Sequence, residues 1–140
     1  MTPDLQFSVL CDDVRREDNG KLMLIGLFEV VGGLSYPMTY PVLHVVNRWC
    51  NGQGEYRQRV RIVSSENITI VETQESPIHL QDTMGQVTAV SLFRNMVLPK
   101  PGKYWVEVLL NGDLKQRFPM IAMEMRQEGP FSPPGPPPFA

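Results

Sequence analysis

The sequence predicts an all-β protein, a single β-sandwich of about eight antiparallel strands with Greek-key features. The strongest observation is residues 98–120, where a Pro/Gly turn, an alternating strand, Asn111-Gly112 and a second strand follow one another. Asn-Gly can adopt positive φ at both central positions of a type I′ turn, whose twist suits a hairpin. Tyr104, Val106, Val108 and Leu110 share one face of the first strand, because successive side chains alternate. No apolar period of 3.6 residues persists long enough to predict a helix.

The remaining strands are expected, in order, at residues 5–14, 21–31, 41–50, 55–64, 68–75 and 86–98. A polar turn ending in Asn19-Gly20 joins the first two into a second hairpin. The strand at 21–31 is apolar enough to be covered on both faces. Residues 76–85 are expected to form a polar loop with room for a short helical turn.

Tyr104 follows a Pro/Gly turn and opens a penultimate strand. This position is typical of the tyrosine corner of Greek-key sandwiches, where the hydroxyl bonds the backbone a few residues upstream. The alternative is an ordinary half-buried tyrosine.

The chain divides into a sandwich domain, residues 1–125, and a Pro/Gly-rich tail, residues 126–140. Proline fixes φ and lacks an amide donor, so the tail is expected to be polyproline II or disordered. Its PxxP-like segments carry Phe131 and Phe139, which we predict to contact a protein partner. The alternative is a solubilising tail.

Net charge and composition exclude several classes of function. The formal charge of -2 gives no basic field for nucleic acid. There is no signal peptide and no apolar run of about 18 residues, so we expect a cytoplasmic protein without a membrane partner. Cys11 and Cys50 are too few for a disulfide scaffold and are expected to be reduced, buried thiols.

Two segments resemble a known family. Cys11-Asp-Asp-Val-Arg15, followed by Gly20-Lys-Leu-Met-Leu-Ile-Gly26, resembles the opening of an uncharacterised bacterial family of short, single-domain β-proteins. Gly102-Lys-Tyr-Trp-Val-Glu-Val108, with the following Asn-Gly, is similar to that family's last hairpin. The resemblance spans about residues 5–123 and implies a compact sandwich without an established activity.

Arg57, Arg59 and Arg61 are the leading ligand-binding candidates. At alternate positions of one strand they share a face, with Arg48 expected on the neighbouring strand. A row of guanidinium groups can hold phosphate or carboxylate. The competing interpretation is a solvated face balanced by acidic residues on adjacent strands.

Two other chemistries are weighed and not favoured. Oxygen ligands for calcium cluster in the first hairpin, but two arginines interrupt them and the spacing is not an EF-hand: Asp12, Asp13, Glu17, Asp18 and Asn19. A nucleophile would need Cys50 to meet His44 or His79, and the sequence contains no hydrolase, zinc-protease or P-loop motif.

The sequence therefore predicts a non-catalytic binding or assembly module that recognises a protein partner or its own copies. It indicates no cofactor and no metal. A small-ligand module that uses the arginine row is the second hypothesis, and an enzyme with a Cys/His pair is the third.

Overall fold

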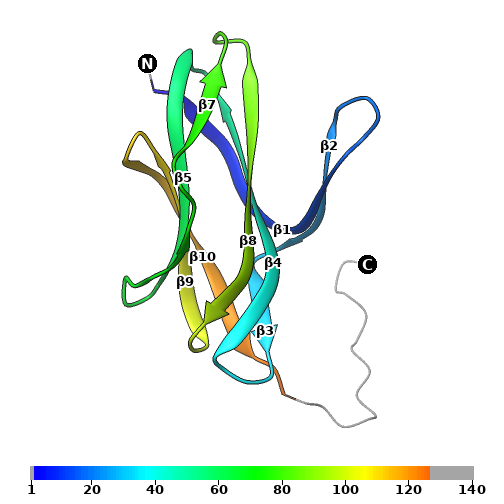
Figure 1. The fold of residues 1–140 in the computed structure, drawn as a ribbon, viewed down its shortest axis with the longest axis vertical. Coiled ribbons are helices and arrows are strands. Elements are labelled where there is room, and N and C mark those ends of the chain that lie inside the picture. The colour runs from blue at the N-terminus through cyan, green and yellow to red at the C-terminus, as the bar shows by residue number, and fades with distance from the viewer. Residues whose placement is uncertain (1, 127–140) are drawn as a thin grey trace.

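Ten strands in two facing sheets make up the protein in a computed structural model, which describes residues 2–126 (Figure 1). No helix occurs in this part of the chain. The strands are β1 (Asp4–Arg16), β2 (Leu22–Phe28), β3 (Val30–Gly33), β4 (Met38–Cys50), β5 (Gly54–Ser64), β6 (Thr69–Glu72), β7 (Ser76–Leu80), β8 (Gln86–Leu98), β9 (Gly102–Leu110) and β10 (Asp113–Glu124). The all-β, sandwich-like fold class is confirmed, with ten strands in place of about eight.

The four-stranded sheet has the order β2-β1-β4-β8 and is antiparallel throughout. The six-stranded sheet has the order β3-β10-β9-β5-β6, with β7 also paired to β5, and it curls like half a barrel. Only Glu29 separates β2 from β3, so the chain passes there from one sheet to the other. As a result β3 runs parallel to β10, the one departure from the antiparallel pairing that the sequence predicts.

The opening hairpin prediction is confirmed by β9 and β10. Asn111 and Gly112 have φ values of 50° and 83°, as a type I′ turn requires. Asn111 also binds the neighbouring strand, because its amide donates to the Arg57 carbonyl and its Oδ1 accepts from the Arg57 amide. The turn therefore fixes β5 as well as its own hairpin.

The tyrosine corner is present. Tyr104 is 2% exposed, and its hydroxyl donates to the Lys100 carbonyl at 2.5 Å. The Lys100 amide approaches the same hydroxyl at 3.4 Å. The side chain thus ties the Pro/Gly turn to the core four residues downstream.

The core lies between the sheets in two clusters. The larger centres on residues such as Leu43, Val106 and Met120, and the smaller on Trp49, Leu80 and Leu110. The second contains a buried polar contact, in which Gln58 Oε1 accepts from Trp49 Nε1 at 2.7 Å and from Asn47 Nδ2 at 3.0 Å.

Two expectations about individual elements are wrong. Residues 76–80 form strand β7, which pairs with β5 and buries Ile78 and Leu80. The buried apolar side chains of β7 alternate with exposed ones, and Pro77 lies on the exposed face. The polar composition of the segment led to the wrong prediction of a loop. The segment at 21–31 is divided between two sheets, and its β2 part is not covered on both faces.

The first hairpin extends beyond the four-stranded sheet as an arm, residues 12–26. β1 pairs with β4 only as far as Cys11, opposite His44, and then pairs with β2 alone. Figure 1 shows this arm standing away from the two layers. Met23 and Ile25 on the arm, and Leu27 directly after it on β2, are 40%, 43% and 61% exposed.

Candidate functional site

The predicted arginine row lies on the outer face of the six-stranded sheet. Its alternation with the buried inner face of β5 is as expected. Cross-strand register places Arg61 and Arg117 on either side of Glu107. Arg61 Nε lies 2.6 Å from one Glu107 oxygen and Arg117 Nε 3.3 Å from the other. The Glu107 side chain is only 7% exposed, so both lone-pair regions of a nearly buried carboxylate are taken by guanidinium groups.

The other arginines of the row differ from each other. Arg59 lies 3.9 Å from Glu72 and 3.7 Å from Glu75. Arg57 makes no ion pair within residues 2–126, and a hollow of about 220 Å³ opens beside it, also lined by Glu75. Carboxylates of neighbouring elements thus balance most of the row. Ligand binding by Arg57, Arg59 and Arg61 stays a prediction.

Trp105 lies beside these ion pairs on the same outer face. Lys103 Nζ is 4.8 Å and the Arg117 guanidinium 4.2 Å from the centre of its ring. The two cations cover the indole by cation–π contacts and reduce its exposure. Sequence reasoning missed Glu107 as the centre of this network, because only the pairing register brings β5, β9 and β10 together.

Arg48 is not next to the row, contrary to expectation, because β4 belongs to the other sheet. Its guanidinium lies 5.4 Å from the centre of the Phe7 ring, and its Nε donates to Thr88 Oγ1 at 3.0 Å. It lines a groove of about 480 Å³ between the four-stranded sheet and the tip of the arm. Arg16 and Lys21 line the groove from the arm, and none of its lining residues between positions 2 and 126 is a carboxylate.

Three of the five oxygen-bearing side chains that the calcium hypothesis considered, those of Asp12, Asp13 and Asn19, make hydrogen bonds or an ion pair within the protein. Asp13 pairs with Arg15 at 2.9 Å and also accepts from the Val14 amide; the first of these contacts is the main reason why the pKa of Asp13 is lowered. Asn19 Oδ1 accepts from the Lys21 amide, and Asp12 accepts from the Tyr40 hydroxyl. In residues 2–126 no three His, Cys, Asp or Glu side chains converge where they could hold a metal ion.

The cysteines and histidines do not assemble into one site. Cys11 is fully buried and free, and burial raises the pKa of its thiol, which opposes nucleophilic reactivity. Cys50 is free but only partly buried, so the expectation of two buried thiols is wrong for it. β4 of the four-stranded sheet carries His44 and Cys50, whereas His79 is on β7 of the other sheet.

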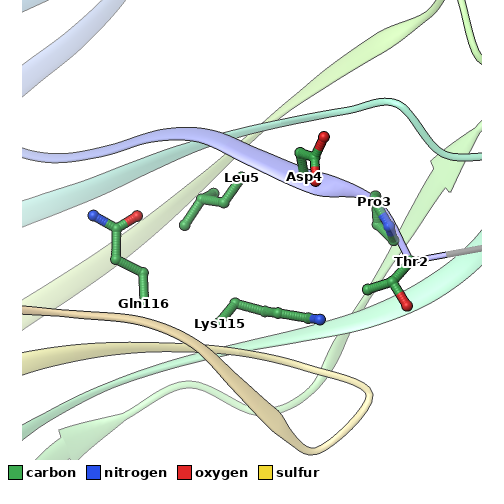
Figure 2. A pocket seen from close by; sticks show the side chains of 6 residues that line it. All are labelled: Thr2, Pro3, Asp4, Leu5, Lys115 and Gln116. Carbon is green, nitrogen blue, oxygen red and sulfur yellow. The ribbon is translucent and has the colours of Figure 1, made fainter.

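A third opening, of about 570 Å³, separates the starts of β1 and β10 (Figure 2). β2 pairs with β1 only from Leu10 onward, and β3 pairs with β10 only from Ile121 onward. The earlier halves of β1 and β10 therefore face each other without a strand between them. Asp4 and Lys115 place opposite charges on this opening, so it has no single electrostatic preference.

A family model matches residues 6–123, which is most of the chain. The chain belongs to the family of unknown function DUF6941. This confirms the family resemblance seen in the two hairpins, and the match includes the arm, the arginine row and the tyrosine corner. A comparison of this DUF6941 member with curated proteins finds no match.

Two further observations concern the ends of the chain and the membrane. Phe131 and Phe139 lie outside the described residues, and their contact with a partner stays a prediction. Residues 2–126 include no helix long and apolar enough to cross a membrane.

Proposed function

We propose that this protein is a non-catalytic assembly module that binds a second copy of itself through β2. The observation that carries the proposal is the row of Met23, Ile25 and Leu27, which are 40–61% exposed on an edge strand. An edge strand with exposed apolar side chains readily pairs with another strand. Most proteins protect such an edge, whereas here it is displayed on an arm.

The sequence of β2 is self-complementary about Ile25. In a two-fold antiparallel pair, Ile25 faces the partner's Ile25, and Met23 faces the partner's Leu27. Each exposed apolar side chain thus meets an apolar one. Lys21 and the partner's Glu29, each one residue outside β2, come close in this pair, so opposite charges flank the apolar centre on both sides. The same interface satisfies free backbone groups of both edges.

The arginine-row hypothesis has less support. Glu72, Glu75 and Glu107 already hold two of its three guanidinium groups. An anion would have to compete with carboxylates that the fold keeps in place. The enzyme hypothesis has no assembled nucleophile and base among the described residues.

The test measures the oligomeric state of the full chain by sedimentation velocity at micromolar concentrations. We expect a dimer for the wild type and a monomer for Ile25→Glu, because that substitution sets like charges on both sides of the two-fold axis. Val97→Glu is the matched control, since Val97 is 50% exposed on the opposite edge strand, β8. It should remain dimeric and melt like the wild type, whereas Ile25→Glu should stay folded but melt lower, because it lacks the stabilisation that the dimer adds.

A charge exchange tests the register. Lys21→Glu and Glu29→Lys should each weaken the dimer, and the two together should restore it. A wild-type monomer, or a dimer that survives Ile25→Glu, would overturn the proposal. A chain ending at Arg126 tests whether the tail, and not the arm, causes association. If that chain is a monomer while Ile25→Glu remains a dimer, association is assigned to the tail with Phe131 and Phe139.

A further inference from the structure

The groove beneath the arm contains two arginines that are held in place without a carboxylate. Thr88 Oγ1 accepts from Arg48 Nε, and the Phe7 ring lies against the same guanidinium. Arg16 Nη1 donates to the Gly20 carbonyl at 3.1 Å. Neither arginine forms an ion pair with any residue from 2 to 126. Each keeps further N–H donors available after these contacts.

We propose that this groove binds a small molecule through a phosphate group. A planar guanidinium matches the oxygens of a phosphate in a bidentate way, and the contacts of Arg48 with Thr88 and Phe7 reduce the freedom that its guanidinium would lose on binding. The volume of about 480 Å³ lies within the range of small-ligand sites, about 300–1,000 Å³. The site is distinct from the arginine row, where glutamates already occupy the equivalent positions.

Neutral donors complete the site. Gln86 and Thr88 line the groove from the first residues of β8, and they add hydrogen-bonding capacity without negative charge. A groove with cations, neutral polar groups and no carboxylate favours a multiply charged anion. Lys21 also lines it, but in the two-fold pair proposed above it comes close to the partner's Glu29. The two arginines therefore carry the inference.

Two regions far apart in sequence form this groove, so its geometry depends on the arm. Arg16 is at the end of β1, whereas Arg48 is near the end of β4. Arg16 on the arm and Arg48 on the four-stranded sheet line the same groove, so a bound phosphate compound would contact both elements. We therefore expect binding to reduce the mobility of the arm.

The experiment titrates the full chain with pyrophosphate, monitored by calorimetry and by melting temperature, against sodium chloride and sodium sulfate at matched ionic strength. We expect saturable binding and a melting temperature higher by about 2 °C or more near saturation, because a ligand that binds the folded state stabilises it. Arg48→Gln and Arg16→Gln should each raise the dissociation constant at least tenfold. Arg48→Lys, which keeps the charge and loses the planar fork, should bind with intermediate affinity.

Arg57→Gln is the control, since Arg57 is the unpaired arginine of the other sheet. It should bind pyrophosphate like the wild type. Absence of saturable binding, an equal response to sulfate, or unchanged binding in Arg48→Gln would overturn the inference. Loss of binding in Arg57→Gln would also overturn it and move the site to the arginine row. Neither Arg16 nor Arg48 lies on β2, so these outcomes are read separately from the dimer test.

Discussion

The body of the sandwich and the arm differ in how far their side chains are paired within the protein. In the body, Glu107 sits between two arginines, Tyr104 bonds a backbone carbonyl, and Gln58 accepts two hydrogen bonds in the core. In the arm, the apolar residues of β2 are exposed and Arg16 lacks a carboxylate partner within residues 2–126. The difference follows from the number of neighbours. A central strand pairs with two neighbouring strands, and their register places partner side chains beside its own. β2 pairs with only one strand. The side chains of the body therefore stabilise the fold through their mutual contacts, whereas the apolar side chains of β2 remain exposed.

Gln58→Leu gives the largest expected loss of stability, because it leaves Trp49 Nε1 and Asn47 Nδ2 without their shared acceptor in the core. We expect the free energy of unfolding to fall by about 3 kcal/mol, since each unsatisfied buried donor costs about 1–3 kcal/mol. Urea titration measures the change. Gln53→Leu, at an exposed loop position, should remain within about 0.5 kcal/mol of the wild type. A small effect at Gln58 would remove the claim that the body depends on its polar contacts.

Glu107→Gln tests the ion pairs on the outer face. We expect a loss of about 2 kcal/mol, less than for a fully buried pair, because Arg61 and Arg117 remain partly exposed to water. Glu75→Gln is the matched control on the same face. Its pair with Arg59 is long and exposed, so its loss should cost no more than about 0.5 kcal/mol.

The same Glu107→Gln variant tests whether glutamate pairing is what keeps the arginine row from binding anions. With its central carboxylate neutral, the arginine row gains net positive charge. It should then bind pyrophosphate more tightly than the wild-type row does, as measured in an Arg48→Gln background. No gain in binding would show that glutamate pairing is not what keeps the row from acting as an anion site.

Tyr104→Phe removes the donor to the Lys100 carbonyl. We expect a loss of about 1–2 kcal/mol in urea titration, because the Lys100 carbonyl loses the donor that the buried Tyr104 supplies in a part-buried hydrogen bond. Tyr36→Phe removes a more exposed hydroxyl, which donates to the Met123 carbonyl, and should cost less. Equal losses in the two variants would mean that the tyrosine corner adds nothing beyond an ordinary hydrogen bond.

How much of this the sequence predicted depends on the range of the interactions. The turn at Asn111-Gly112 and the Tyr104 corner depend on residues a few positions apart, and both were predicted. The partners of the arginine row were not, because Glu107 reaches Arg61 only through the register of β5 and β9. The groove joins Arg16 and Arg48 through an arm whose projection no local pattern indicates. Apolar composition suggested that β2 is buried, since composition alone cannot distinguish a core strand from an exposed edge.

Asp13→Asn gives the smallest expected effect and a pH dependence. The pKa of Asp13 is lowered in the folded protein, mainly by Arg15, so its contribution to stability is present above the ordinary carboxyl pKa. That contribution is lost as the pH falls through the lowered value. The variant should melt slightly below the wild type at pH 7, and the difference should fade in acid. A difference in melting temperature that persists unchanged in acid would contradict this assignment.

The parallel pairing of β3 with β10 has a consequence for biosynthesis. β10 is the last strand of the domain, and it lies between β9 and β3, which precedes it by about ninety residues. The six-stranded sheet therefore cannot close while the chain is still being translated through β9. Contacts this distant in sequence form slowly, and strand edges that wait for them are prone to aggregation. β3 and β9 therefore lack the strand between them until β10 has left the ribosome. The six-stranded sheet is completed only after the domain has been translated.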